Sequence, residues 1–105
     1  MKDLRELIEL SSTHYHVRNA SPSEEDDGSM IKYWEETTGI SLDRRNWQCP
    51  KCGQWFNRSM LDGAHVVLSL LNNHPQYITP LCQSCNREKD KKTFWILKDY
   101  VVPAP

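Results

Sequence analysis

The four cysteines are the residues whose spacing predicts chemistry most directly. They form two C-x2-C pairs, Cys49 with Cys52 and Cys82 with Cys85, and 29 residues lie between the pairs. A tight turn lets both sulfurs of such a pair reach one ion, and two pairs complete the tetrahedral sulfur shell of a structural zinc site. The alternative is two redox or free-thiol pairs, but a redox pair is expected within a βαβ pattern, which this sequence lacks. We therefore expect one structural zinc with no open coordination position.

The charge distribution divides the chain. Its 105 residues suffice for one domain and are too few for two ordinary ones. Residues 1–43 hold four Lys or Arg against ten Asp or Glu, whereas residues 44–105 hold nine against four, so the net charge of −1 conceals an acidic and a basic part. We expect one compact domain with two segments: an N-terminal, helical and acidic segment at 1–43, and a zinc-binding unit at 44–105.

Hydropathy and charge exclude several classes of protein. No apolar run approaches the ~18 residues of a membrane-spanning helix, and the first residues are charged rather than typical of a signal peptide. The divided charge also excludes a uniformly basic coat protein and a long disordered acidic chain. We expect a cytoplasmic protein without a membrane partner, in which cysteines are more often metal ligands than disulfides.

The N-terminal elements are predicted from apolar spacing and turn residues. Apolar side chains recur at helical spacing over residues 2–10, and residues 14–17 favour a short extended piece. The acidic run at 24–27 is predicted as a loop, and a helix that begins near Ser21 is the alternative. A helical face follows at residues 30–34, and Gly39 is expected to end that helix.

The elements of the basic part must bring the two cysteine pairs together. Residues 47–56 favour a tight turn with short flanking strands, and Gly53 permits the backbone conformation that follows such a turn. Residues 65–71 form an apolar stretch that contains β-branched side chains. A helix is predicted at 83–92, opening inside the second pair, and residues 94–102 are predicted as either helix or strand.

Three segments of the basic part resemble HNH endonucleases that carry a zinc knuckle. They are RRNWQCPKCG at 44–53, DGAHVV at 62–67 and ITPLCQSCNREK at 78–89, in this order, and the resemblance covers a little under half of the chain. It implies a ββα-metal, treble-clef-like unit, in which a hairpin and a helix surround a catalytic metal. The predicted fold class is therefore α+β: a small zinc-bound ββα unit with an N-terminal helical extension.

The same resemblance implies a catalytic site. His65 matches the family's general base, whose near-neutral pKa lets it take a proton from the attacking water. A divalent cation such as Mg²⁺, Mn²⁺ or Ni²⁺ would stabilise the charge that develops on the phosphate. Asn86 holds the position of a ligand to that cation, and Asp62 reaches the cation if Gly63 bends the strand.

The sequence departs from the family pattern at two positions. Ala64 stands where family members often have an Asp or His ligand, and Tyr77 stands where they have an Asn that orients the base. These departures leave two hypotheses of function. The first is metal-dependent hydrolysis of phosphodiester bonds in DNA, and the second is a catalytically degenerate, zinc-stabilised module that binds nucleic acid or a protein partner.

A nucleic-acid partner, with DNA favoured over RNA, requires cationic side chains at the surface. The candidates flank the cysteine pairs: Arg44, Arg45, Lys51, Arg87, Lys89, Lys91 and Lys92. A merely solvated charged face is the alternative interpretation. Three tryptophans, Trp47, Trp55 and Trp95, are expected in the core of so small a protein, and stacking on bases is the alternative role.

Overall fold

A computed structural model describes residues 13–20, 28–69, 75–88 and 92–105 of the chain. The helix predicted at 2–10 and the acidic run at 24–27 lie outside the described residues. The described part is a small mixed α+β structure, which confirms the predicted class at that level. None of its helices is long and apolar enough to cross a membrane.

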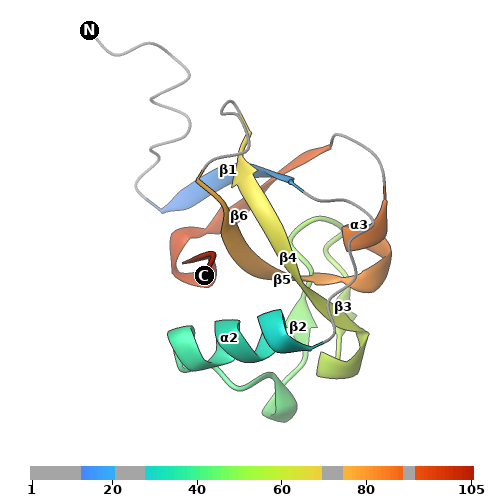
Figure 1. The fold of residues 1–105 in the computed structure, drawn as a ribbon. Helices are drawn as coiled ribbons and strands as arrows, with labels where there is room; N and C mark the ends of the chain where they lie inside the picture. The colour runs from blue at the N-terminus through green and yellow to red at the C-terminus, as the bar shows by residue number, and fades with distance from the viewer. Residues whose placement is uncertain (1–12, 21–27, 70–74, 89–91) are drawn as a thin grey trace, which may run out of the picture.

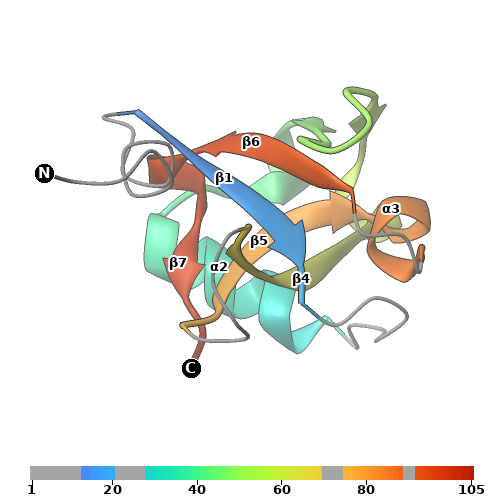
Figure 2. The same cartoon turned by 90° about the horizontal axis from the view of Figure 1, so that it is seen from above.

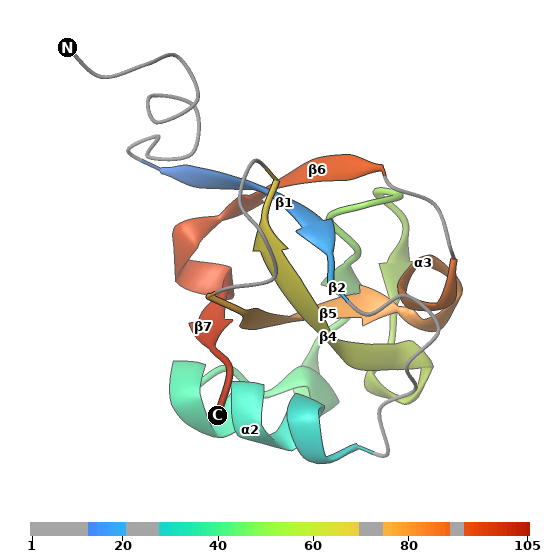
Figure 3. The ribbon, with the colours of Figure 1, turned by 45° about the horizontal axis from the view of Figure 1, so that its top comes forward.

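A five-stranded sheet with the strand order β6-β1-β4-β5-β7 organises the fold (Figure 3). Its strands are antiparallel neighbours and comprise β1 (His14–Asn19), β4 (Leu61–Leu68), β5 (Tyr77–Cys82), β6 (Thr93–Leu97) and β7 (Val102–Pro103). The extended piece predicted at 14–17 is confirmed as β1, which lies inside the sheet. The stretch at 94–102 begins as a strand and continues as a short 3-10 helix, Lys98–Tyr100.

The first six residues of β4 pair with β5, and its last three pair with β1. This pairing is continuous from Leu61 to Val66, so no bulge interrupts the strand at Gly63. The bend at Gly63 that would turn the Asp62 side chain to the other face is therefore not formed. Gly63 serves packing instead, because a Cβ at this position would lie 2.5 Å from the Cβ of Met30.

Helix α2 (Ser29–Thr38) packs against β4 and β5 (Figure 1) and against β7 (Figure 3). It buries Ile31 and Trp34 and ends at Gly39, which adopts a left-handed conformation with a φ of 78°. The N–H of Gly39 donates to the carbonyl of Glu35 over 2.9 Å, so one of the last helical carbonyls is satisfied. The helix predicted around 30–34 and its stop at Gly39 are both confirmed.

The β2 (Trp47–Gln48) and β3 (Trp55–Phe56) strands form a separate two-stranded ribbon, as the tight turn between them predicts. Helix α3 (Gln83–Arg87) follows directly on β5 (Figure 2). This helix is shorter than the predicted 83–92, because the backbone of Glu88 is already extended. Cys82 is the N-cap residue of α3, and Cys85 lies in the first turn of this helix.

An aromatic cluster attaches the ribbon to the sheet. The Trp47 ring packs edge-on against Trp34 and Tyr100, with ring centroids 5.1 and 5.0 Å apart. The indole N–H of Trp47 donates to the carbonyl of Pro80 on β5 over 3.0 Å. The buried ring therefore gains both packing and a hydrogen bond, and the turn after β2 is held beside the end of β5.

Candidate metal centre

The first cysteine pair lies in the turn between β2 and β3. The N–H of Gly53 donates to the carbonyl of Cys49, and the N–H of Cys49 donates to the carbonyl of Gln54, each over 2.8 Å. Gly53 has a φ of 79°, a conformation that side chains with a Cβ rarely adopt. The glycine therefore allows the chain to reverse immediately after Cys52, as the sequence predicts.

The second pair lies where β5 becomes α3. Cys82 occupies the N-cap position of α3, and its Sγ accepts a hydrogen bond from the backbone N–H of Cys85 over 3.4 Å. This contact satisfies one of the N–H groups that a helix start leaves without a helical partner. Both thiols thus point from the first turn of α3 toward the ribbon.

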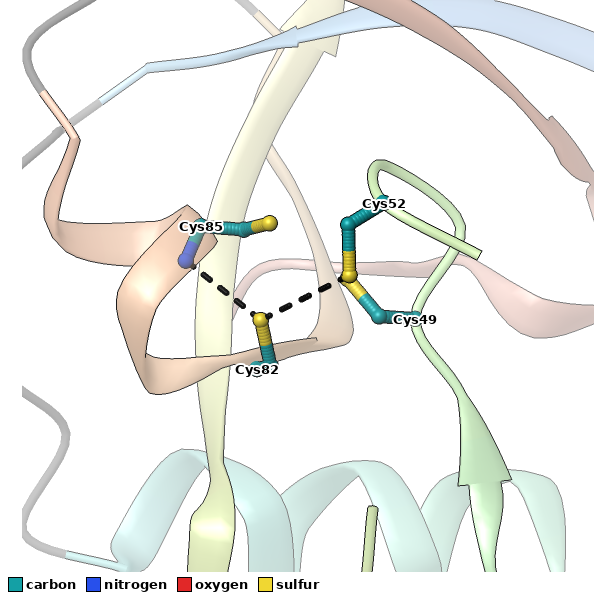
Figure 4. A group of neighbouring side chains, drawn as sticks. All are labelled: Cys49, Cys52, Cys82 and Cys85. Atoms are coloured by element: carbon teal, nitrogen blue, oxygen red, sulfur yellow. Dashed lines mark hydrogen bonds between the residues drawn. The ribbon is translucent and has the colours of Figure 1, made fainter. Parts of the chain in front are cut away.

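The four sulfur atoms converge on one point (Figure 4). The Sγ atoms of Cys49, Cys52, Cys82 and Cys85 all lie within 4.8 Å of one another. The Sγ atoms of Cys52 and Cys82 are 3.9 Å apart. In a regular tetrahedron with zinc–sulfur bonds of about 2.3 Å the sulfurs are about 3.8 Å apart, so the cluster has the dimensions of a zinc site. It is the one such group of potential metal ligands in the described part of the chain.

The thiols are not electrostatically equivalent without a cation. Burial raises the pKa of Cys82 to about 11, although hydrogen bonds with Cys85 oppose the shift. Burial and the neighbouring thiols raise the pKa of Cys85 still further. At Cys52, hydrogen bonds from the Gln54 backbone and from the other thiols outweigh burial and lower the pKa. A bound cation would stabilise the thiolates that burial disfavours, because metal ligation requires deprotonated sulfur.

Lys51 connects the two halves of the metal centre. Its ammonium group donates to the carbonyl of Cys85 and pairs with the carboxylate of Glu88, each at 3.4 Å. Its side chain is only 5% exposed. The sequence predicts Lys51 as a nucleic-acid contact, but the structure places its ammonium group between the β2–β3 turn and α3.

Asp62 and Asn86, two predicted ligands of a catalytic metal, are brought together inside the protein. The amide of Asn86 donates to Oδ2 of Asp62 over 2.8 Å, and the Nε of Arg87 lies 3.3 Å from the same oxygen. Asn19 of β1 donates through Nδ2 to the backbone oxygen and to Oδ1 of Asn86, over 2.9 and 3.0 Å. Asp62 and Asn86 are almost fully buried, so their polar groups serve one another rather than an exposed site.

Sequence reasoning missed Asn19. The signal was available, because alternation along a strand at residues 14–19 places Asn19 on the same face as the apolar Val17. Both side chains are buried. An inward-facing amide needs a polar partner, and the partner is Asn86.

His65, the predicted general base, lies elsewhere. Side chains alternate along a regular strand, so His65 shares a face of β4 with Gly63, on which α2 packs. Asp62 projects from the opposite face. The structure therefore brings Asp62 and Asn86 together and separates both of them from His65.

The predicted nucleic-acid contacts occupy different environments. Arg44 and Arg45 are exposed next to the ribbon, and no carboxylate of the described residues pairs with either of them. Arg87 pairs with Asp62, and Lys92 is exposed. Lys89 and Lys91 lie outside the described residues.

The tryptophans do not share one environment either. Trp47 is buried, as predicted, but Trp55 and Trp95 are 63% and 48% exposed. The expectation that all three lie in the core is therefore wrong for two of them. Of these three tryptophans, the chain buries Trp47 at the junction of ribbon and sheet and leaves Trp55 and Trp95 at the surface.

Comparisons of the chain with family models, with curated proteins and with solved structures found nothing that matches. The resemblance to HNH endonucleases rests on the motifs at 44–53, 62–67 and 78–89. The structure itself shows four cysteines placed to bind one metal ion, in an arrangement compatible with structural zinc.

Proposed function

We propose that this chain is a zinc-stabilised module that binds nucleic acid. The observation that carries the proposal is the convergence of four thiols from the β2–β3 turn and from α3. A metal held by four sulfurs has no open position for a substrate, so it acts by joining two short segments that have little regular structure of their own. The role of the metal is to fix the surface that these segments present.

Exposed cations beside this metal centre support nucleic acid as the ligand. Arg44 ends a short 3-10 helix, Leu42–Arg44, and Arg45 lies two residues before β2; the segment that contains them carries the basic excess of the chain. No carboxylate of the described residues pairs with these guanidinium groups, so they are suited to contact phosphates, and such contacts provide most of the affinity of non-specific binding. The resemblance to HNH endonucleases favours DNA over RNA.

Binding can be measured with the zinc-loaded protein and fluorescent DNA and RNA oligonucleotides at several salt concentrations. We expect an affinity that falls as salt rises, and an Arg44→Ala/Arg45→Ala variant whose salt dependence is shallower by about one unit of slope for each lost phosphate contact. Lys32→Ala, on the exposed side of α2, is the matched control and should leave the slope unchanged. Equal slopes for the parent and the double variant would contradict the proposal.

A second candidate function, metal-dependent phosphodiester hydrolysis, rests on the resemblance of the segments at 44–53, 62–67 and 78–89 to HNH endonucleases. Asp62 and Asn86 are buried and bonded to one another, so they would have to separate to hold a cation. In this function the two side chains would hold a divalent cation and His65 would act as the base, which requires movement because His65 lies on the other face of β4. The test is incubation with plasmid DNA and with RNA in the presence of Mg²⁺, Mn²⁺ or Ni²⁺. Cleavage that is lost in His65→Ala would support hydrolysis, whereas salt-sensitive binding without cleavage would leave the binding module as the function.

A further inference from the structure

A pocket of about 500 Å³ lies between the first cysteine turn and β6. The buried Trp47 and the half-buried Tyr100 contribute to its apolar lining, and Trp55 and Trp95 contribute its exposed aromatic side chains. The pocket adjoins Cys49, so the position of one wall depends on the metal centre.

The two exposed tryptophans are unusual for a chain of this size, because large aromatic side chains contribute most to stability when buried. Trp95 is oriented by its neighbour on β1: the His16 ring stacks on the indole with centroids 4.6 Å apart and planes 25° from parallel. Trp55 stands on the ribbon on the other side of the pocket. The pocket is therefore bordered by aromatic surface on two separate elements.

The polar side chains of the pocket define the charge of its ligand. His14, Arg45, Asn46 and Gln48 line it, and no Asp or Glu of the described residues does. The amide N–H of Gln48 donates to the carbonyl of Gly53 over 3.0 Å, which leaves the side-chain oxygen of Gln48 as an acceptor. A cationic ligand would be repelled by Arg45, and no carboxylate of the described lining residues would offset this repulsion. These groups match a flat ligand that has hydrogen-bond donors and acceptors at its edge and a negatively charged group beside it.

The pocket also continues into the cationic surface. Arg45 and Asn46 line a second hollow of about 520 Å³ as well, which also includes Arg44 and the pair formed by Arg58 and Asp43, so its arginines outnumber its one carboxylate among the described residues. A strand that places its phosphates on Arg44 and Arg45 would therefore pass the mouth of the aromatic pocket. Binding of single strands commonly combines these two elements, a cationic path for the backbone and aromatic side chains on which bases stack.

We propose that this pocket receives one unstacked base of a bound nucleic acid, stacked on Trp55 or Trp95 while Arg45 contacts an adjacent phosphate. The inference rests on the proposed nucleic-acid binding, and it specifies that the pocket recognises a base of the bound strand. It requires single-stranded or locally opened nucleic acid, because a base paired within a duplex is not accessible to such a pocket. Every base has a π-face, so the pocket need not select a sequence.

The test compares three fluorescent ligands of equal length: a single strand, the same strand without bases (abasic), and the blunt duplex, each as DNA and, where it can be made, as RNA. We expect tighter binding of the intact single strand than of the other two. Of Trp55→Ala and Trp95→Ala, the variant that removes the stacking ring should weaken binding of the intact strand by about tenfold, the order expected for loss of one base–aromatic stack, and both should leave the abasic strand unchanged. Phe at that position should restore most of the affinity.

Met60→Ala is the matched control, because Met60 is a large apolar side chain that is 48% exposed and does not line the pocket. Zinc content and melting temperature are measured for every variant, so that misfolding is recognised. If the parent protein binds intact and abasic strands equally and the Trp variants change neither affinity, the base pocket is overturned while nucleic-acid binding stands. If the parent binds none of the ligands, the proposed function fails and the inference fails with it.

Discussion

Two clusters of polar or ionisable side chains in the described part of the chain differ in what completes them: the buried cluster around Asp62, and the four cysteines, of which all but Cys52 are buried. Around Asp62, each oxygen of the carboxylate has a donor: Asn86 and Arg87 bond to it, and Asn19 in turn bonds to Asn86. In the four-cysteine cluster, the thiols have mainly one another as partners, and burial raises the pKa of Cys82 and Cys85.

This difference separates a structural network from a binding site. Buried polar groups that satisfy one another need no further ligand, and they specify how the elements pack. Buried thiols that must ionise to bind a metal are completed only by a cation. The Asp62 cluster therefore fixes α3 onto β4 and β1 without a ligand. The cysteine cluster, in contrast, requires a metal ion from the solution.

Removal of the metal should produce the largest effect. Because the four thiols hold the β2–β3 turn against α3, we expect a zinc chelator, or Cys85→Ser, to cause loss of cooperative thermal unfolding. In zinc-finger peptides the corresponding binding free energy is about 10–16 kcal/mol. Circular dichroism and elemental analysis provide the measurement, and Ser84→Ala, at the exposed position beside Cys85, is the control. An unchanged melting transition in metal-free protein would show that the cysteine cluster, like the Asp62 cluster, needs no ligand to stabilise the fold.

Asp62→Ala should be the next most damaging change. It leaves the buried Asn86 amide without its acceptor, which costs about 1–3 kcal/mol, and the loss of the Arg87 pair adds less because the Arg87 side chain is 37% exposed. The zinc stoichiometry of the folded fraction should stay at one per chain, because Asp62 is not a ligand of the thiol-bound ion. Urea unfolding with parallel zinc analysis measures both quantities, and Asp99→Ala, an exposed carboxylate, is the comparison.

A stability loss below about 1 kcal/mol would mean that the Asp62 cluster does not contribute as a buried network. Loss of zinc together with stability in the folded fraction would mean that the two clusters are not separate.

The pH dependence of zinc affinity tests whether the thiols of the cysteine cluster must release protons when the metal binds. The Cys82 thiol, with a pKa near 11, keeps its proton at pH 7 in the metal-free protein and must release it when zinc binds. Lower pH favours the protonated thiol and so weakens binding, by about tenfold per pH unit for each proton released. Competition with a chromophoric chelator between pH 6 and pH 8 measures the slope. A flat profile would contradict the description of Cys82 as a protonated thiol.

Asn19→Ala should have the smallest effect of the four changes. It removes two hydrogen bonds to Asn86 but leaves the contact between Asn86 and Asp62 intact, so we expect a loss of about 1–2 kcal/mol. Thermal unfolding measures it, and the nearby Arg18→Ala tests whether any change at the end of β1 has the same cost. A loss as large as that of Asp62→Ala would show that β1 and α3 depend on Asn19 more than the geometry implies.

Local features of the sequence were sufficient to predict much of this structure. The C-x2-C spacing and Gly53 predict the first cysteine turn, because both are properties of a few consecutive residues. The same holds for the end of α2 at Gly39. The length of α3 could not be predicted in this way: residues 83–92 are rich in helix formers, but the described helix ends at Arg87, whose guanidinium pairs with Asp62 of β4.

The candidate catalytic residues show the limit of arguments from spacing. Asp62 and His65 are three positions apart, which predicts opposite faces of a straight strand, and the continuous pairing of β4 with β5 keeps the strand straight. Gly63 allowed a bend, but in the structure it allows α2 to approach the backbone instead. A glycine is compatible with both outcomes, and only the packing partner decides between them.

The sequence by itself determined that two cysteine pairs form turns able to bind a metal, and that the basic excess lies in the segment containing them. Only the tertiary structure decided which polar residues meet, since Asn19, Asp62 and Asn86 are far apart in the chain and belong to three elements. It also decided that Lys51 is buried while Trp55 and Trp95 are exposed, against the usual preference of each residue type. The physical reason is that ligand spacing in a turn is a local property, whereas burial depends on which surfaces distant segments bring together.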